Sequence, residues 1–308
     1  MPEPCVLDPK AVRRQAERRA RMPIERDFIA REIERRMIER LDLIRLEPAC
    51  ILDVGCGRGA GSRALAARWP TALCLAVDLA PGALRPLSGL AARGLAARAG
   101  AWLARTGTRL RGGATPPPGR PLPVVADTHR LPLPAASIDL LWSNLAWHQF
   151  HDPSAVLAEW YRVLRPGGLL MFSAFGVDTL RELPGAWPGI VRFPDMHDVG
   201  DALVGAGFAE PVMDAERITL GYREPLDLIA ELRAALGGNP RADRARGLAG
   251  RRARETALAR LAASRGSDGL IPVGLEIIQG HAWCPSPKRL PAGLAHLRFV
   301  PRPTTGAP

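Results

Sequence analysis

The chain has 308 residues, of which 47% are hydrophobic, enough to bury the core of one large domain. It contains no apolar run long enough to span a membrane, no secretory signal between Met1 and Ala20, and no C-x-x-C spacing among its five cysteines, so we expect a cytoplasmic protein without disulfides, zinc or membrane contact. The net charge of +11 comes almost entirely from arginine spread along the chain, which indicates either a compositional bias or a basic surface for an acidic partner.

Alternating helices and strands are predicted along most of the first 175 residues. Asp27 to Ile44 carries an apolar stripe with helical spacing, and Ser62 to Arg68 and Ser154 to Leu164 are further helices. Short apolar runs predict five strands, at Ala49–Val54, Leu73–Val77, Val124–Val125, Ile138–Trp142 and Leu169–Phe175. This alternation predicts an α/β fold with a doubly wound, mostly parallel sheet covered on both faces.

A glycine-rich turn follows the first predicted strand and precedes a helix. It reads Asp53-Val-Gly-Cys-Gly-Arg-Gly59, and Asp78 ends the next strand. Glycines let the backbone approach a ligand closely, and an acid after the second strand can accept both ribose hydroxyls of an adenosine. NAD and S-adenosylmethionine (SAM) both carry such a ribose. The G-x-G-x-G spacing with an acid two residues upstream favours SAM, because dinucleotide sites more often use G-x-G-x-x-G.

Further positions complete the predicted SAM site. Asp127 follows the third strand, where it can bind the adenine amino group, and Pro166-Gly167-Gly168 precedes the fifth strand. Alternatives remain for single members: Asp53 could cap a helix, and Cys56 is better explained by packing than as a nucleophile. The predicted cofactor-binding residues are Asp53, Gly55, Gly57, Gly59, Asp78, Leu79, Asp127, Thr128 and Asn144.

The fourth predicted strand ends in Trp142-Ser-Asn-Leu-Ala-Trp-His-Gln-Phe150. Ligands of doubly wound sheets bind at the carboxyl ends of the strands. We therefore expect Trp147 and His148 to border the methyl group or the acceptor; packing against a helix is the alternative. The segment differs from Asn-Pro-Pro-Tyr, which disfavours methylation of a flipped nucleic-acid base and a nucleic-acid partner.

The sequence also predicts how the chain is divided. Residues 1–25 form a basic N-terminal arm, 26–180 the SAM-binding domain, 181–300 a substrate and lid part of the same domain, and 301–308 a disordered tail. The connection 83–123 is long and rich in Gly and Pro, which predicts an exposed insert. Arg241 to Arg265 is rich in Arg and Ala and is predicted to be a surface helix.

Several stretches resemble the malonyl-[acyl-carrier protein] O-methyltransferase family of biotin synthesis, a class I SAM-dependent methyltransferase family. They are Leu131-Pro-Leu-Pro, Ser143-Asn-Leu-Ala146, Leu164-Arg-Pro-Gly-Gly168, Phe172-Ser-Ala-Phe-Gly-Val-Asp-Thr-Leu-Arg-Glu-Leu183, Asp195-Met-His-Asp-Val-Gly200 and Gly280-His-Ala-Trp283. The resemblance runs from about residue 25 to residue 285. The basic N-terminus, Arg13 to Arg21, is more similar to a sister family, the complex I assembly factors that hydroxylate an arginine.

The resemblance implies a SAM-dependent enzyme that methylates the free carboxyl group of malonyl-[acyl-carrier protein], with a Rossmann-like fold and an acidic carrier protein as partner. That carboxylate is already ionised at neutral pH, so the reaction needs alignment rather than a general base. A fixed guanidinium suits a carboxylate clamp. Arg192 is the candidate and Arg181 the second candidate, while a solvated surface arginine is the alternative. A protein-arginine hydroxylase or a non-catalytic assembly factor remains the alternative function.

Overall fold

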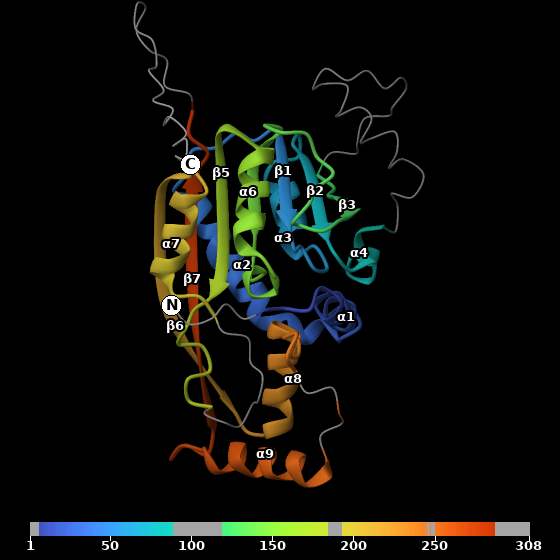
Figure 1. Cartoon of the computed structure of the whole chain (residues 1–308), viewed down its shortest axis with the longest axis vertical. Helices are drawn as coiled ribbons and strands as arrows, with labels where there is room; N and C mark the ends of the chain where they lie inside the picture. Colours follow the sequence, from blue (N-terminus) through green and yellow to red (C-terminus); the bar gives the residue numbers. More distant parts are fainter. Residues whose placement is uncertain (1–5, 89–118, 184–192, 245–246, 248–249, 287–308) are drawn as a thin grey trace, which may run out of the picture.

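The computed structural model describes residues 6–88, 119–183, 193–244, 247 and 250–286. In this part of the chain seven strands form one sheet in the order β3-β2-β1-β4-β5-β7-β6 (Figure 1). Strands β1 to β5 are parallel, whereas β7 runs antiparallel to both β5 and β6. The predicted doubly wound, mostly parallel sheet is therefore confirmed. The strands are β1 Cys50–Val54, β2 Leu73–Asp78, β3 Leu122–Val125, β4 Ile138–Ser143, β5 Leu164–Phe175, β6 Ala209–Tyr222 and β7 Ile271–Trp283.

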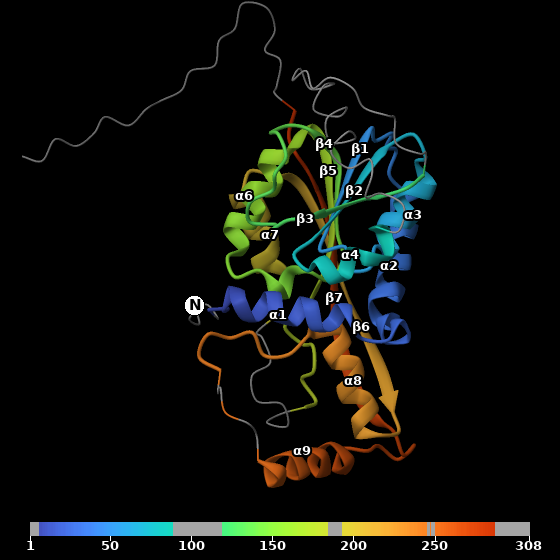
Figure 2. The ribbon, with the colours of Figure 1, turned by 90° about the vertical axis from the view of Figure 1, so that its right-hand side faces the viewer.

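Helices cover both faces of the sheet. Figure 2 shows α6 and α7 on one side and α2 and α3 on the other. None of the described helices is long and apolar enough to cross a bilayer. The helices are α1 Pro9–Ala20, η1 Ile24–Asp27, α2 Phe28–Leu41, α3 Ala60–Arg68, α4 Pro81–Ser88, η2 Trp147–Gln149, α6 Pro153–Val163, α7 Met196–Gly205, α8 Pro225–Leu236 and α9 Arg251–Ala263.

Two apolar clusters, one on each face, explain the continuous apolar runs of the parallel strands. Neighbouring strand residues point to opposite faces, so Ile51 packs with α2 and Leu52 packs with α6, and both are fully buried. On α2 the predicted stripe of Ile29, Ile33 and Met37 faces the sheet and is buried. Burial of these side chains holds both helix layers at fixed places around the carboxyl ends of the strands.

Two boundaries differ from the prediction. Strand β5 begins at Leu164, not Leu169, because Leu164 pairs with Ile138 of β4; the Pro-Gly-Gly segment then lies inside an irregular start of the strand, where Gly167 has a φ of +79°. Within the helix predicted at 241–265, the structure describes α9 at Arg251–Ala263, whereas residues 241–244 are not helical. The predicted tail and the Gly- and Pro-rich part of the 83–123 connection lie outside the described residues. The division at residue 180 stays a prediction.

The N-terminal helix α1 was not predicted, since residues 1–25 were interpreted as an arm. Its side chains that pack inward are small, and Ala11, Val12 and Ala16 are buried. Asp8 caps its first turn by accepting from the backbone N–H of Lys10 at 2.9 Å. Figure 2 shows α1 crossing beneath the ends of the central strands, next to α8. The helix therefore closes one side of the ligand crevice.

Candidate cofactor and substrate site

The glycine-rich turn after β1 is held against the end of β2. The backbone N–H groups of Gly55 and Cys56 donate to the carbonyl oxygen of Val77 at 2.9 and 3.0 Å. Gly55 has a φ of +70°, and a Cβ built on it would lie 2.8 Å from the Cβ of Ala146. A side chain there would combine backbone strain with a collision, which explains why glycine is required. Gly57 and Gly59 also have positive φ values, of +54° and +73°.

Asp78 shapes the same turn from the end of β2. Its carboxylate accepts from the backbone N–H groups of Gly57 at 3.0 Å and of Ala80 at 2.8 Å. Burial raises the pKa of Asp78, and the two hydrogen bonds and the nearby Arg19 offset part of that rise. The carboxylate is thus fixed in direction at the wall of the cavity, with capacity to accept further hydrogen bonds.

Asp53 lies at the end of β1 and is 2% exposed. Its carboxylate accepts a short hydrogen bond from the hydroxyl of Ser62 on α3. Burial raises the pKa of Asp53 to about 7, with the negative charge of Asp78 adding to the rise and the Ser62 hydrogen bond opposing it. Asp53 is more deeply buried than Asp78, which is 8% exposed.

The end of β4 carries a buried hydrogen-bond network that the sequence did not predict. The side-chain amide of Asn144 donates to Glu34 Oε2 at 2.7 Å, and Trp142 Nε1 donates to Glu34 Oε1 at 2.7 Å. Asn144 Oδ1 accepts from the hydroxyl of Ser173 on β5 at 2.7 Å. This network ties α2 to β4 and β5 and places Glu34 in the cavity wall.

Asp127 and Thr128 follow β3 and also line the cavity. Burial alone would raise the pKa of Asp127, but the backbone N–H and the ring of His129 lower it below its usual value. Thr128 accepts a hydrogen bond from Trp160 Nε1 at 2.9 Å. The Asp127 carboxylate is therefore ionised at neutral pH and able to accept from an amino group.

Trp147 and His148 lie in the core of the protein, away from the cavity. Both are buried in η2, and neither belongs to the lining of the cavity. Trp147 packs against Phe172 with ring centroids 5.8 Å apart, and His148 packs edge-on against Phe175 at 5.5 Å. Burial lowers the pKa of His148 to about 3, so its ring is neutral. The packing interpretation accounts for both residues, in place of the predicted position beside the acceptor.

Of the two candidate clamps, the structure describes only Arg181. Arg192 lies outside the described residues. Arg181 is exposed and pairs with Asp178 at 3.1 Å, and the described lining does not include it. No group of three His, Cys, Asp or Glu side chains suited to a metal is found in the described part of the chain.

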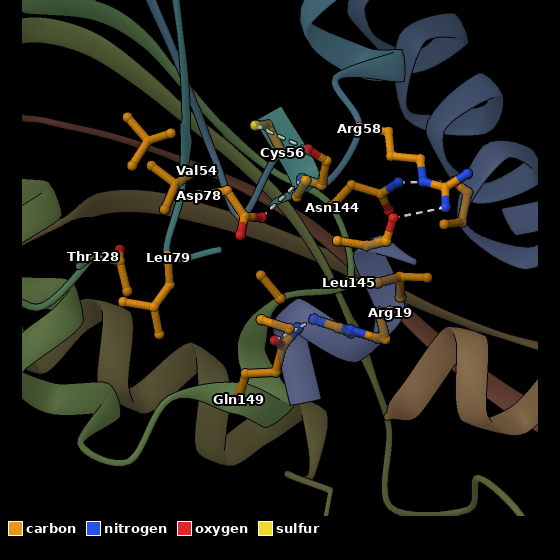
Figure 3. A pocket seen from close by; sticks show the side chains of 18 of the residues that line it. Arg19, Val54, Cys56, Arg58, Asp78, Leu79, Thr128, Asn144, Leu145 and Gln149 are labelled. Atoms are coloured by element: carbon orange, nitrogen blue, oxygen red, sulfur yellow. Dashed lines mark hydrogen bonds between the residues drawn. The ribbon is translucent and has the colours of Figure 1, made fainter. Parts of the chain in front are cut away.

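A cavity of about 590 Å³ lies among these elements, and its lining includes Glu34, Asp53, Gly55, Gly57, Asp78, Asp127 and Asn144. Figure 3 shows Asp78, Leu79, Thr128 and Asn144 around it. Helix α1 supplies Arg19, whose guanidinium donates a short hydrogen bond to Gln149 of η2 on the cavity wall. All nine predicted cofactor residues except Gly59 line it. The side chain of Leu87 covers Gly59, because a Cβ there would lie 2.5 Å from that side chain.

The cavity suits SAM in size and in charge. Small-molecule sites commonly measure about 300–1,000 Å³. SAM carries one net positive charge, from a sulfonium and an ammonium group against one carboxylate. Three buried carboxyl groups, of Glu34, Asp53 and Asp78, line the cavity. Burial raises the pKa of all three groups and so disfavours their charged forms, which a bound cation would favour.

Comparison with known proteins gives the family. Residues 52–172 match the family model described as "Methyltransferase domain". The malonyl-[acyl-carrier protein] O-methyltransferase of Gallionella capsiferriformans is 41% identical over 289 residues, covering 92% of this chain and 93% of the relative. The protein of the same name from Laribacter hongkongensis is 42% identical, with 93% of each chain covered.

The fold has relatives among solved structures. A proposed methyltransferase from Bacillus halodurans matches with a TM-score of 0.53 and 16% identity, covering 81% of this chain and 99% of that one. This likeness concerns the fold alone. The two sequence relatives match over more than nine tenths of this chain and of their own length. The chain therefore belongs to the malonyl-[acyl-carrier protein] O-methyltransferase family.

Proposed function

We propose that this chain catalyses SAM-dependent O-methylation of the free carboxyl group of malonyl-[acyl-carrier protein] in biotin synthesis. The main support is its identity of about 40% with proteins of that name along nearly the whole chain. Bound SAM supplies a methyl group on a positively charged sulfur, which an ionised carboxylate oxygen can accept directly. No residue then needs to remove a proton, which agrees with the position of His148, buried and outside the cavity lining.

The chain's own residues bind and orient in this proposal. Asp78 accepts the ribose hydroxyls, Asp127 accepts from the adenine amino group, and Asp53 and Glu34 face the charged end of the cofactor. Helix α1 covers the cavity and excludes water, because its buried face packs against Leu79, Ala80 and Ala83 and its Arg19 holds Gln149. Holding the reactants in place in a dry site can lower the activation free energy of methyl transfer by about 7–11 kcal/mol.

The opening of the cavity supports an acidic partner. Lys10 and Arg13 of α1, Arg31 of α2 and Arg63 of α3 line the cavity and are exposed. Among the described residues none of these four side chains forms an ion pair, whereas about half of the other described arginines do. We call these four residues the basic rim. Unpaired cations at the entrance attract an acidic carrier protein by charge complementarity, as the proposed reaction requires.

The decisive experiment is a direct assay of the product. The purified chain is incubated with SAM labelled in its methyl group and with malonyl-carrier protein, and label in a base-labile ester is measured. Acetyl-carrier protein, which lacks a free carboxylate, is the matched control and should stay unlabelled. Label on both carriers, or on neither, would contradict the proposal. A mass gain of one oxygen on a partner protein would instead indicate the arginine hydroxylase.

Replacement of Arg192 by alanine tests the proposed carboxylate clamp. We expect Arg192→Ala to lose most turnover of malonyl-carrier protein while SAM affinity stays near normal, because a carboxylate entering a dry site without a cation is costly. Arg192→Lys should be intermediate, since it keeps the charge without the planar fork. Initial rates and SAM affinity are measured separately.

Arg181→Ala is the matched control, because the exposed guanidinium of Arg181 already pairs with Asp178. Its turnover should remain close to that of the unmodified chain. A loss in Arg181→Ala together with normal rates in Arg192→Ala would assign the clamp to Arg181.

A further inference from the structure

Glu34 differs from the other acidic residues of α2 because its side chain faces the cavity. It is 9% exposed, and its two oxygens accept hydrogen bonds from Trp142 and Asn144, both at 2.7 Å. A Cβ added to Gly61 would lie 2.2 Å from Glu34 Oε1, so glycine at this position lets the carboxyl group reach the first turn of α3. The position of Glu34 is therefore fixed by α3, by Trp142 of β4 and by Asn144 just after β4.

Asp53 lies beside this group at the end of β1. Both carboxyl groups line the same cavity, and neither receives a hydrogen bond from a basic side chain in the described part of the chain. Two of the guanidinium groups that line the cavity have other partners: Arg58 lies 4.0 Å from Asp27, and Arg19 donates to Gln149. The other charged and titratable groups that line the cavity are Lys10 and Arg13 of α1, Arg26 of η1, Arg31 of α2, Cys56 of the turn, Arg63 of α3, Asp78 of β2, Asp127 and His129 after β3, and His151 after η2.

Two neighbouring buried carboxyl groups cannot both ionise without a large free-energy cost, because each charge is poorly solvated and repels the other. Burial and the charge of Asp53 raise the pKa of Glu34 to about 8, against the hydrogen bonds from Asn144 and Trp142. The pKa of Asp53 is raised to about 7, first by burial. The two groups interact, so their protons belong to the pair. At neutral pH the ligand-free pair therefore retains a proton that the same groups lack in water.

We propose that Glu34 and Asp53 form a proton-coupled receptor for the positive charge of SAM, holding a proton in the ligand-free protein and releasing it when SAM binds. The proposal rests on the proposed function, because it assumes SAM as the ligand. Glu34 is then a specificity-determining residue that no linear motif marks. Glu34 recognises the cofactor by its charge, because the positive charge of SAM takes the place of the proton that the two buried acids hold in the ligand-free protein.

The proposal fixes the sign of a pH dependence. If binding releases a proton, raising the pH favours the bound state, so SAM affinity increases between about pH 6 and pH 8. The increase approaches tenfold per pH unit where a full proton is released. Above about pH 8 the ligand-free pair has already lost its proton and the affinity levels off.

The test is calorimetric titration of SAM into the full chain at several pH values, each in two buffers with different heats of ionisation. The difference between the buffers measures protons released per SAM bound. We expect a release approaching one proton near pH 7, and at least a twofold smaller release in Glu34→Gln. Asp53→Asn, the second variant, should show the same reduction, and thermal unfolding checks that both variants fold.

Glu32→Gln is the matched control, with the same substitution on the same helix. Arg35 and Arg36 lower the pKa of Glu32 to about 2, so this residue stays ionised across the range and its loss should leave proton release unchanged. A change in hydrogen bonding alone would weaken binding in Glu34→Gln without altering the protons released, and that result would overturn the proposal.

Failure of this inference and failure of the proposed function give different results. SAM affinity that stays flat between pH 6 and pH 8, with no proton released, would overturn the inference while ester formation still supports the function. Proton release on SAM binding without methyl ester on malonyl-carrier protein would overturn the proposed function and support the inference. An unmodified chain that binds no SAM would overturn both.

Discussion

Asp78→Ala is expected to weaken SAM binding by about 5-fold to 150-fold, equivalent to about 1–3 kcal/mol. The substitution removes the acceptor for the ribose hydroxyls and also releases the backbone N–H groups of Gly57 and Ala80. The glycine-rich turn then loses its anchor, which adds to the loss of direct contact. Calorimetric titration of SAM measures the change.

Asp214→Ala provides the matched control for Asp78→Ala. Asp214 is exposed on β6, where it pairs with Arg40 on the outside of the molecule. Its loss should change SAM affinity by less than about twofold, since exposed ion pairs contribute about 0–1 kcal/mol to stability and this one is remote from the cavity. Equal affinities for the unmodified chain and a folded Asp78→Ala variant would remove Asp78 from the cofactor site.

Charge reversal in the basic rim is expected to lower kcat/KM for malonyl-carrier protein by about 10-fold to 100-fold at low salt. The variant is Arg13→Glu combined with Arg31→Glu. Both side chains are exposed, so the effect should fall on the encounter with the acidic carrier. It should shrink as salt rises, because the Debye length drops from about 30 Å at 0.01 M to about 8 Å at 0.15 M.

Two controls separate docking from other causes. SAM affinity of the rim variant should remain within about threefold of the unmodified value, since Asp53, Asp78 and Glu34 form the deeper wall that holds the cofactor. Arg252→Glu combined with Arg254→Glu reverses the same charge on α9, which Figure 1 places at the far end of the molecule from α1 and β1. If this α9 variant loses as much turnover as the rim variant, net charge rather than the rim governs the encounter.

The parallel half of the fold was predictable because its signals are local. Each inner strand is a short apolar run buried on both faces, and the turn at Gly55 requires a positive φ that the sequence marks with glycine. The antiparallel half gave weaker signals. On β6 most residues are exposed or half-buried, with charges such as Asp214 and Arg217 in the strand, and only pairing with β7 defines it.

Helix α1 illustrates a different limit. Its buried face consists of alanines and one valine, so no large apolar stripe distinguishes it from a charged arm. The local signals that could have found it are Asp8 as the cap and Pro9 in the first turn. Its place across the crevice depends on contacts with distant residues, which the sequence of the helix alone does not contain.

The residues of the site likewise fall into those that a local motif marks and those that only the fold brings together. Asp53, Gly55, Gly57 and Asp78 could be predicted to lie together because a linear motif places them at the ends of β1 and β2, and all four line the cavity. Glu34 was missed because its importance comes from meeting Trp142 and Asn144, over one hundred residues away. His148 was assigned to the crevice from its position after β4, but η2 turns its ring into the core against Phe175.

The position of β7 between β5 and β6 constrains the order in which the chain can be assembled during synthesis. Strand β5 ends at Phe175, but its antiparallel neighbour begins only at Ile271, about a hundred residues later. Until β7 emerges from the ribosome, β5 and β6 each present an unpaired edge to other nascent chains. A chain interrupted before Ile271 would retain the cofactor motif and still expose two aggregation-prone edges, so a late stop codon should abolish soluble protein.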